Sequence, residues 1–467
     1  MKRLLPLLVA ALAFAGLTEA AAQSRTSYFM EGSYFRTELN PALVPTRGYL
    51  ALPLISGFGY NDSSNYNSLE NNYFYKDDKY VSGLDDRVSA GEYLAGFPDV
   101  CRRDLSETYN LLGVGFYAKR TFWNFGVNGR ITSQTTTPKS MLGYLKSPDG
   151  TLFEEGTQGF GSAFLDVYLG TSFPVTRWMN VGVRAKFLVG ILDIGLEVES
   201  LMTSPESNDL VDVLRGRWRI NTGILDNRNV TPEGEYVDND EHDGSLGDLL
   251  RNVNSYGGAI DLGAEARLLD NHLKLSLAVT DLGFIRWHPT SHLCGELVES
   301  ETGSINESTT KEMISVPEKP GYTTTLNCSL NVGAEYSILN NHIGFGVLSH
   351  TKFGKSMTYT ELTASINFRP TNWLSATVSH TFFNGNRPGI FGAALNIHPA
   401  VINIFLGVDF IDTKYVLNYD LPPLSDSDVM AYPPMPVAKS ATSVNVYAGV
   451  GINFGRPKHL KSDRRKE

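Results

Sequence analysis

Four acidic side chains stand inside segments whose alternating pattern is typical of β-strands. They are Asp166, Asp261, Glu265 and Asp409. A charge removed from water needs a partner of opposite sign or a water-filled path. We therefore predict that these carboxylates line an enclosed polar path, or form ion pairs with Arg36 or Arg47 near the start of the chain.

Histidine follows serine twice in strand-like segments, at His350 and His380. Such a pair could in principle supply a nucleophile and its base. Alternation places His380 on the same face as Leu374 and Val378, which is an apolar face. We predict structural roles for both histidines.

Motifs of enzymes are absent from the sequence. It contains no Gly-x-Ser-x-Gly elbow, no His-Glu-x-x-His and no glycine-rich phosphate loop. We predict that the protein is not an enzyme and holds no catalytic residues and no cofactor. The alternative left open is a catalytic site assembled from dispersed strand residues.

An acidic run at 238–244 carries enough oxygens to attract Ca²⁺. Its spacing departs from the EF-hand loop and the closing Glu is missing, so we predict a solvated loop. His288 and His292 are four residues apart, but nothing indicates a helix there. We predict no metal site.

The chain has three cysteines, Cys101, Cys294 and Cys328. Their spacing does not resemble a zinc site. Cys101 and Cys294 both fall in long predicted connections, so they are the candidate pair for a disulfide. The alternative, that all three are thiols, stays open.

Composition indicates strands and turns as the elements that position these side chains. Charged residues are 19% of the 467, against about 25% in ordinary soluble proteins. Gly (44), Phe (24) and Tyr (22) are abundant, a mix that favours strands and turns. The formal net charge of −10 argues against nucleic acid as a partner.

The N-terminus has the layout of a secretory signal peptide. Lys2-Arg3 precede an almost wholly apolar run from Leu4 to Leu17, and three alanines end at Ala22. The run is shorter than the ~20 residues of a membrane-spanning helix, which is the alternative. We predict that residues 1–22 are cleaved and that the protein is exported. Beyond residue 22 no stretch is apolar enough for a helical span.

From about residue 48 the sequence repeats segments of alternating character. In the last one, Val444, Val446 and every second residue to Phe454 are mostly apolar, whereas Asn445 to Asn453 are polar, aromatic or glycine. Period-2 alternation puts the two sets on opposite faces of a strand. Most segments reach the roughly 9–11 residues of a tilted membrane-crossing strand. Their small, polar second face suits a barrel lumen.

We predict an all-β transmembrane antiparallel barrel over residues 48–454 with about fourteen strands. The strands lie near 48–60, 109–118, 121–132, 161–173, 178–202, 255–268, 272–284, 323–337, 341–353, 359–369, 373–384, 389–398, 402–414 and 442–454. Short turns alternate with longer connections, as in outer-membrane barrels, whose short turns are periplasmic.

One strand makes the count uncertain, because 178–202 is long for a single crossing. Gly190 and Gly195 could mark a kink or bulge. Alternatively the segment is two strands, and Arg215 to Asn221 raises the total to sixteen.

Three of the five tryptophans, Trp123, Trp178 and Trp373, each begin a strand just after a short turn. We predict that they form a periplasmic aromatic girdle.

The segment 23–47 is not barrel-like. It contains Tyr28-Phe29-Met30 and then Asn40-Pro41-Ala42. Irregular backbone is tolerated where protein or water surrounds it, so we predict a plug in the lumen, with an ordered periplasmic arm as the alternative. Residues 455–467 form a charged C-terminal tail.

Two stretches resemble a known family. Ser27 to Met30 with Asn40-Pro41-Ala42 is similar to the start of Bacteroidota outer-membrane proteins of the DUF5723 type, and Thr280 to Trp287 resembles a strand-end motif of the same group. The Asn-Pro-Ala element also resembles the hatch of the wider FadL-like barrels, including the PorV type. This resemblance implies fourteen strands and a plugged lumen. No ligand-binding residue of the fatty acid transporters matches here.

The predicted function follows from these expectations. We expect a monomer in the outer membrane, in contact with its lipid, that passes or takes up a small solute. Hydrophobic cargo is implied by the FadL-like resemblance alone. The alternative is a non-transporting barrel that docks secretion or cell-surface proteins, as PorV-type barrels do.

Overall fold

The computed structural model describes residues 25–52, 57–146, 152–153, 156–202, 213–221, 253–288, 292–297, 321–383, 390–411, 415–417, 436–440 and 443–455. The predicted signal peptide, the acidic run at 238–244 and the tail beyond residue 455 lie outside the described residues.

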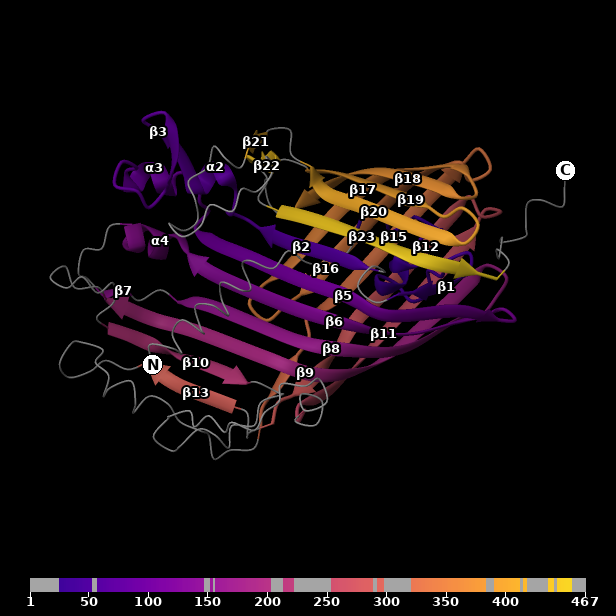
Figure 1. Ribbon diagram of the computed structural model, residues 1–467, viewed down its shortest axis with the longest axis horizontal. Helices are drawn as coiled ribbons and strands as arrows, with labels where there is room; N and C mark the ends of the chain where they lie inside the picture. The colour runs from indigo at the N-terminus through magenta and orange to yellow at the C-terminus, as the bar shows by residue number, and fades with distance from the viewer. Residues whose placement is uncertain are drawn as a thin grey trace.

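The chain forms a closed antiparallel barrel of fourteen strands (Figure 1). The circle closes where β23 (Ser443–Phe454) pairs with β1 (Gly48–Ala51) and β2 (Phe58–Ser64), two halves of the first strand. Both halves also pair with the next strand. This confirms the predicted fold class and strand number.

The other barrel strands follow in chain order, each paired with the next. They are β5 (Val100–Ala118), β6 (Thr121–Pro138), β8 (Thr157–Pro174), β9 (Met179–Met202), β11 (Tyr256–Leu268), β12 (Leu273–Arg286), β15 (Cys328–Ile338), β16 (Ile343–Phe353), β17 (Thr358–Thr371), β18 (Leu374–Phe383), β19 (Ile390–Ile397) and β20 (Ile402–Ile411). Two short strands extend barrel strands: β7 (Leu152–Phe153) continues the line of β8 along β9, and β14 (Thr323–Thr325) continues the line of β15 along β12. Two further strands, β10 (Val213–Asn221) and β13 (His292–Leu297), join the same sheet outside the circle.

The two faces of the strands differ as the alternation predicted. In β23, Asn445, Tyr447 and Asn453 are buried toward the lumen, whereas Val450 and Phe454 are exposed. The exposed large apolar residues of β8 and β20, such as Leu169 and Leu406, likewise point outward. The barrel therefore has a polar inside and an apolar outside, the reverse of a water-soluble sheet.

The long segment from 178 to 202 is one strand, not two. Residues 179–189 of β9 pair with β11, and residues 193–202 pair with β10 instead. The change of partner comes at Gly190, next to a register shift against β8. A Cβ at Gly190 would lie 2.7 Å from the ring of Trp287, so glycine makes room for that buried indole. β10 exists as the alternative expected, but it lies outside the circle and the count stays fourteen.

Small elements gather at the end of the barrel where the long connections lie, which we call the long-loop end (Figure 1). They are the helices α2 (Leu69–Asn72), α3 (Ala90–Leu94) and α4 (Lys139–Lys146), and the pairs β3 (Tyr73–Lys76) with β4 (Lys79–Ser82) and β21 (Tyr415–Leu417) with β22 (Pro436–Ala438). Ser89 caps α3 by accepting a hydrogen bond from the Glu92 amide at 3.2 Å. No helix of the described residues is long and apolar enough to span a membrane.

Cys101 lies in a cluster below these helices, packed with Val81, Val88 and Phe97. It retains its thiol, which lies 3.7 Å from the Pro98 carbonyl oxygen, so the predicted disulfide with Cys294 is wrong. Cys101 is the second residue of β5, beside β6, whereas Cys294 belongs to β13, which pairs with β10. The side chain of Cys294 is outside the described part of the structure.

The opposite end, the short-turn end, carries two turns of the same build. Residues 269–271 and 339–341 all have positive φ, near 53°, 53° and 70° in the first turn and 52°, 53° and 68° in the second. A histidine follows each turn. His272 Nδ1 is 2.8 Å from the Ser337 carbonyl oxygen, and His342 Nδ1 is 2.8 Å from that of Arg369. A carbonyl only accepts, so each ring donates from Nδ1 and ties its turn to the next strand.

Residues 25–47 lie inside the barrel near its short-turn end (Figure 1). Most are buried, and the one regular element is the 3₁₀ turn η1 (Phe35–Glu38). Tyr34 stacks on Tyr49 of β1 with ring centroids 4.4 Å apart. We refer to residues 25–47 as the plug.

Candidate functional site in the barrel lumen

The Asn-Pro-Ala turn sits against two strand glycines. Asn40 Oδ1 accepts a hydrogen bond from the Ala42 amide at 2.9 Å, which closes the turn. Gly182 of β9 and Gly263 of β11 are cross-strand partners directly beneath it. A Cβ on Gly182 would overlap the Pro41 carbonyl, and one on Gly263 would overlap the Asn40 amide. The paired glycines therefore form the flat seat that this turn requires.

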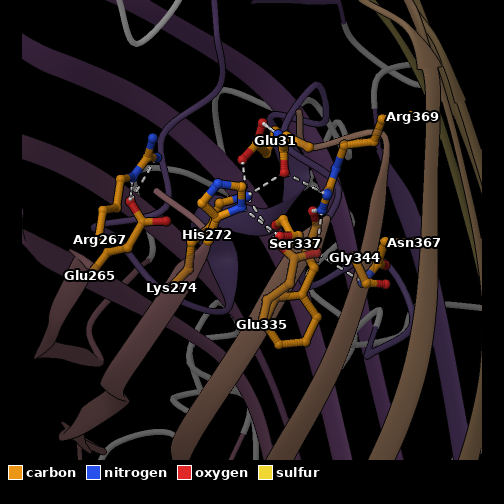
Figure 2. Close-up of polar contacts among 12 residues, drawn as sticks. Glu31, Glu265, Arg267, His272, Lys274, Glu335, Ser337, Gly344, Asn367 and Arg369 are labelled. Carbon is orange, nitrogen blue, oxygen red and sulfur yellow. Dashed lines mark hydrogen bonds and ion pairs between the residues drawn. The ribbon is translucent and has the colours of Figure 1, made fainter. Parts of the chain in front are cut away.

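Glu31 fastens the plug at the short-turn end (Figure 2). Its carboxylate lies 2.6 Å from Lys274 Nζ of β12 and accepts from Asn341 Nδ2 at 3.2 Å. Lys274 also reaches Glu335 of β15 at 2.9 Å, and Glu335 pairs with Arg369 of β17. Glu31 thus completes a network in which acidic and basic groups alternate.

Arg369 adds a second tie to the plug in the same network, since its Nη2 donates to the Phe29 carbonyl at 2.8 Å. Burial alone would raise the pKa of Glu31. The charges of Lys274 and Arg369 outweigh it and hold the pKa well below the usual carboxylate value.

A second cluster is built around Asp281, which has φ 62° within β12. Its amide donates to Asp261 Oδ1 at 2.7 Å, beside a register shift in the β11–β12 ladder. The bulge turns the Asp281 carboxylate into the lumen, where it takes two bonds from Arg130, at 2.5 and 2.8 Å, and one from Lys186 at 2.7 Å. Asp tolerates this left-handed backbone better than most residues. The structure thus explains the Asp within the predicted strand-end motif.

The rest of this second cluster reaches the plug. Asp166 lies 3.5 Å from Arg130 and 3.8 Å from Lys186. Arg184 of β9 is fully buried and lies 2.9 Å from Glu38 of η1. Glu38 is therefore the second acidic residue that ties the plug to the wall.

A third cluster holds the start of the plug. Arg25 Nε lies 2.5 Å from Glu361 of β17, and both side chains are buried. Thr26 donates to Asp409 of β20 and lies 2.6 Å from Ser379 of β18, oxygen to oxygen. Charged plug residues therefore meet partners on several sides of the barrel.

The four predicted lumenal carboxylates are all buried inside the barrel. Asp409 contacts the plug directly, and Asp166 and Asp261 neutralise lumenal cations. Glu265 pairs with Arg267 at 2.8 Å, and its charge acts on the buried Arg36 of the plug.

Arg47 was the other predicted anchor, and it binds backbone instead. It donates to the carbonyls of Ala400 and Gly455. The anchors that sequence reasoning missed are Arg25, Glu31 and Glu38. Their signal was a charge within a segment otherwise rich in aromatic residues.

The remaining predicted positions are also placed. Trp123, Trp178 and Trp373 are 37%, 50% and 45% exposed at the short-turn end, and the periplasmic girdle stays a prediction. His350 is buried and lies 2.7 Å from Asn331 Oδ1. His380 packs between the rings of Phe382 and Phe391. Neither histidine meets a serine nucleophile in a described hydrogen bond.

A cavity of about 60 Å³ remains at the long-loop end of the lumen. Its charged lining comprises Glu107, Arg130, Asp193, Arg219, Asp281, Lys352 and Lys355, and its apolar lining comprises Phe160, Phe164, Ile285 and Leu326. A water needs roughly 10–15 Å³ of such space, and a dry cavity that takes benzene has about 150 Å³. The cavity therefore holds a few waters or one small polar molecule. No group of metal-binding side chains occurs among the residues that the structure describes.

Comparison with known proteins gives a family match and a set of similar folds. A family model described as a family of unknown function, DUF5723, matches residues 41–409. No curated protein matches.

Among solved structures, the toluene transporter TodX of Pseudomonas putida is 9% identical, with 91% of this chain and 95% of that one covered and a TM-score of 0.40. A FadL homologue of Pseudomonas aeruginosa is 10% identical, with 95% and 99% covered and a TM-score of 0.42. The monoaromatic hydrocarbon channel CymD is 9% identical, with 95% and 96% covered and a TM-score of 0.33.

Proposed function

The chain belongs to the DUF5723 family, and from the geometry of its lumen we propose that it is an outer-membrane barrel through which a small solute passes when the plug moves. In this proposal the plug is a gate and the cavity at the long-loop end is the solute's first binding place. The protein acts as a monomer and has no enzymatic activity.

The observation that carries the proposal is how the plug is attached. Charged and polar contacts tie it to the wall through Arg25, Glu31 and Glu38. Water can replace such contacts one by one as the plug shifts. A segment fixed only by interdigitated apolar side chains would lose its packing outright. The polar wall also leaves a path that water can fill.

The outer membrane is the proposed location because of the outer face. Large apolar side chains are exposed all around the barrel, and Trp123, Trp178 and Trp373 are exposed together at the short-turn end. An exposed apolar surface of this kind is stable against lipid and aggregates in water. The short-turn end then faces the periplasm.

The side chains that line the cavity indicate which class of solute it can accept. The resemblance to FadL-like barrels implies hydrophobic cargo, and Phe160, Phe164 and Ile285 offer a partly apolar wall. Charged groups such as Arg219 and Lys355 share that wall. We therefore propose a small polar solute ahead of a hydrocarbon.

A disulfide lock tests the gate. Thr26 and Ser379 touch across the boundary between plug and wall, with oxygens 2.6 Å apart, so cysteines at both positions should cross-link when oxidised. Liposomes containing the T26C/S379C variant should pass small polar solutes slowly when oxidised and at the wild-type rate after reduction. Each single cysteine variant, treated with the same oxidant, is the control.

Two outcomes would count against the proposal. Equal flux through the oxidised and reduced double variant would show that the plug does not gate passage. Wild-type liposomes no leakier than protein-free liposomes would remove the transport role, and a barrel that docks surface or secretion partners would then be the better assignment.

A further inference from the structure

A short turn reaches over the lumen at the long-loop end. Residues 354–357 join β16 to β17, and the Gly354 amide donates to the Met357 carbonyl at 3.0 Å. The Ser356 amide donates to Gln134 Oε1 of β6 at 3.3 Å. β6 does not neighbour β16 or β17 in the barrel, so the turn crosses the lumen. A Cβ on Gly354 would overlap the Gln134 side-chain amide, so the absence of a side chain at Gly354 lets Gln134 lie this close to the turn.

The crossing places Lys355 on an aromatic ring of the facing wall. Its Nζ lies 3.6 Å from the ring centroid of Phe160 in β8. Arg219 of β10 lies 5.6 Å from the same centroid. Two cationic side chains therefore lie against one ring beside the cavity.

Lys355 lacks an acidic partner in the part of the chain that the structure describes, whereas the other cavity cations have one. Arg219 pairs with Asp193 at 2.9 Å, Lys352 with Asp104 at 2.5 Å, and Arg130 with Asp281 at 2.5 Å. Lys355 is exposed at the mouth of the cavity. Partial desolvation and the charge of Arg219 lower the pKa of Lys355, and the more distant charges of Asp193 and Glu197 only partly oppose them. A bound anion would offset both effects.

We propose that this cavity is an anion site in which Lys355 binds a small carboxylate or phosphate, with Arg219 and the wall hydroxyls completing its shell. Ser133 lines the cavity and its hydroxyl can donate to an anionic oxygen. The volume of about 60 Å³ limits the ligand to a few heavy atoms or to the charged end of a larger molecule. The inference deepens the proposed function, because it names the class of solute that the lumen receives.

Acidic side chains also line the cavity, so the test must compare an anion with a cation as the ligand. Asp281 is already bonded to Arg130 and Lys186, and Asp193 accepts from Arg219, Ser162 and Tyr322. These carboxylates have their positive or hydroxyl partners, so a cationic ligand would have to displace them. An anion needs no such exchange at Lys355.

Calorimetric titration of the whole protein in neutral detergent tests the site at constant ionic strength and neutral pH. The probes are acetate, inorganic phosphate and tetramethylammonium. Wild-type protein should bind acetate or phosphate saturably and tetramethylammonium not at all. Lys355→Gln should weaken anion binding at least tenfold and Lys355→Arg should largely restore it. Lys79→Gln, which removes an exposed charge from the same end, should leave it unchanged.

The outcomes distinguish a carboxylate site from a phosphate site. They also distinguish the anion site from the proposed gated passage. Binding of acetate alone or phosphate alone, lost in Lys355→Gln, assigns the site to that chemistry. The anion site is wrong if neither anion binds, if only tetramethylammonium binds, or if Lys355→Gln binds like the wild type. Liposome flux with the locked plug is measured independently, so the anion site can fail while gated passage stands, or the reverse.

Discussion

At the scale of single residues, glycines that lack a side chain decide where the plug can lie. Gly182 and Gly263 are paired across β9 and β11, and the Asn-Pro-Ala turn rests directly on them. Neither glycine has a positive φ, so space and not backbone freedom explains them. Asp281 is the opposite case, because there the left-handed backbone itself aims the carboxylate at Arg130 and Lys186.

We expect Gly182→Ala to displace the turn from its seat. The added methyl group would overlap backbone atoms of Pro41 and Ala42, which cannot rotate away as a flexible side chain would. Overpacking of this kind typically costs about 1–3 kcal/mol. The free energy of unfolding in urea should fall by that amount, and the plug should become more accessible to protease.

Gly258→Ala is the matched control, since it lies in β11 and its Cβ would meet nothing closer than 3.7 Å. It should leave both measurements close to the wild type. Equal losses in the two variants would mean that strand propensity, not the seat for the turn, causes the effect.

At the scale of elements, the plug is an irregular segment that the barrel holds through aromatic packing and through charge. Arg25, Glu31 and Glu38 lie in three separate networks, each with partners on different strands. The short-turn end supports this arrangement, because His272 ties its turn to Ser337 of the next strand beside the Glu31 network (Figure 2).

The Glu31 network predicts a specific dependence on pH. The pKa of Glu31 is held well below the usual value, so its stabilising contribution is fully present above the ordinary carboxylate range. That contribution is lost only as the pH falls below the ordinary carboxylate range and through the depressed pKa of Glu31. Glu31→Gln should lower the free energy of unfolding by roughly 1.5–3 kcal/mol at pH 7 and at pH 5, because a charged hydrogen bond to Lys274 is removed. The difference in the free energy of unfolding between the variant and the wild type should narrow only at lower pH.

Glu92→Gln provides the comparison, since Glu92 pairs with Lys76 at 2.9 Å on the exposed surface of the long-loop end. An exposed pair contributes little, so this variant should stay near the wild type at every pH. If the difference in unfolding free energy between Glu31→Gln and the wild type already disappears at pH 5, the pKa of Glu31 is not depressed.

At the scale of the whole molecule, the barrel inverts the usual distribution of polarity. Asn, Asp, Ser and Thr are buried in the lumen, while Leu, Phe, Ile and Val are exposed outside. This inversion requires a closed ring of strands, because an open sheet edge has unpaired backbone groups that lipid cannot satisfy. The pairing of β23 with β1 and β2 removes that edge.

The orientation in a bilayer can be measured with the tryptophans. Variants that keep only Trp123, Trp178 or Trp373 should be quenched strongly by lipids brominated near the headgroup and weakly by lipids brominated at the chain ends. Trp287 is fully buried inside the lumen, so a variant that keeps only Trp287 should be quenched by neither lipid. Quenching of the three rim variants by an aqueous quencher alone would rule out the girdle.

The sequence by itself determined the architecture, because alternation is a local property of each strand. The apolar and polar sets of residues 444–454 follow from neighbours two positions apart, and the even series of strands follows from turn spacing. The four buried carboxylates were found for the same reason. The disulfide was not determined this way, since pairing of Cys101 depends on which strands lie beside it.

Only the tertiary structure decided how the lumen is arranged, because its contacts join residues far apart in the chain. Thr26 meets Ser379, and Glu31 meets Lys274, although hundreds of positions separate each pair. Lys355 reaches Phe160 only because a four-residue turn crosses a closed ring. Strand periodicity tells which side chains face inward. Which of them meet is set by closure of the barrel and by the path of the plug through it.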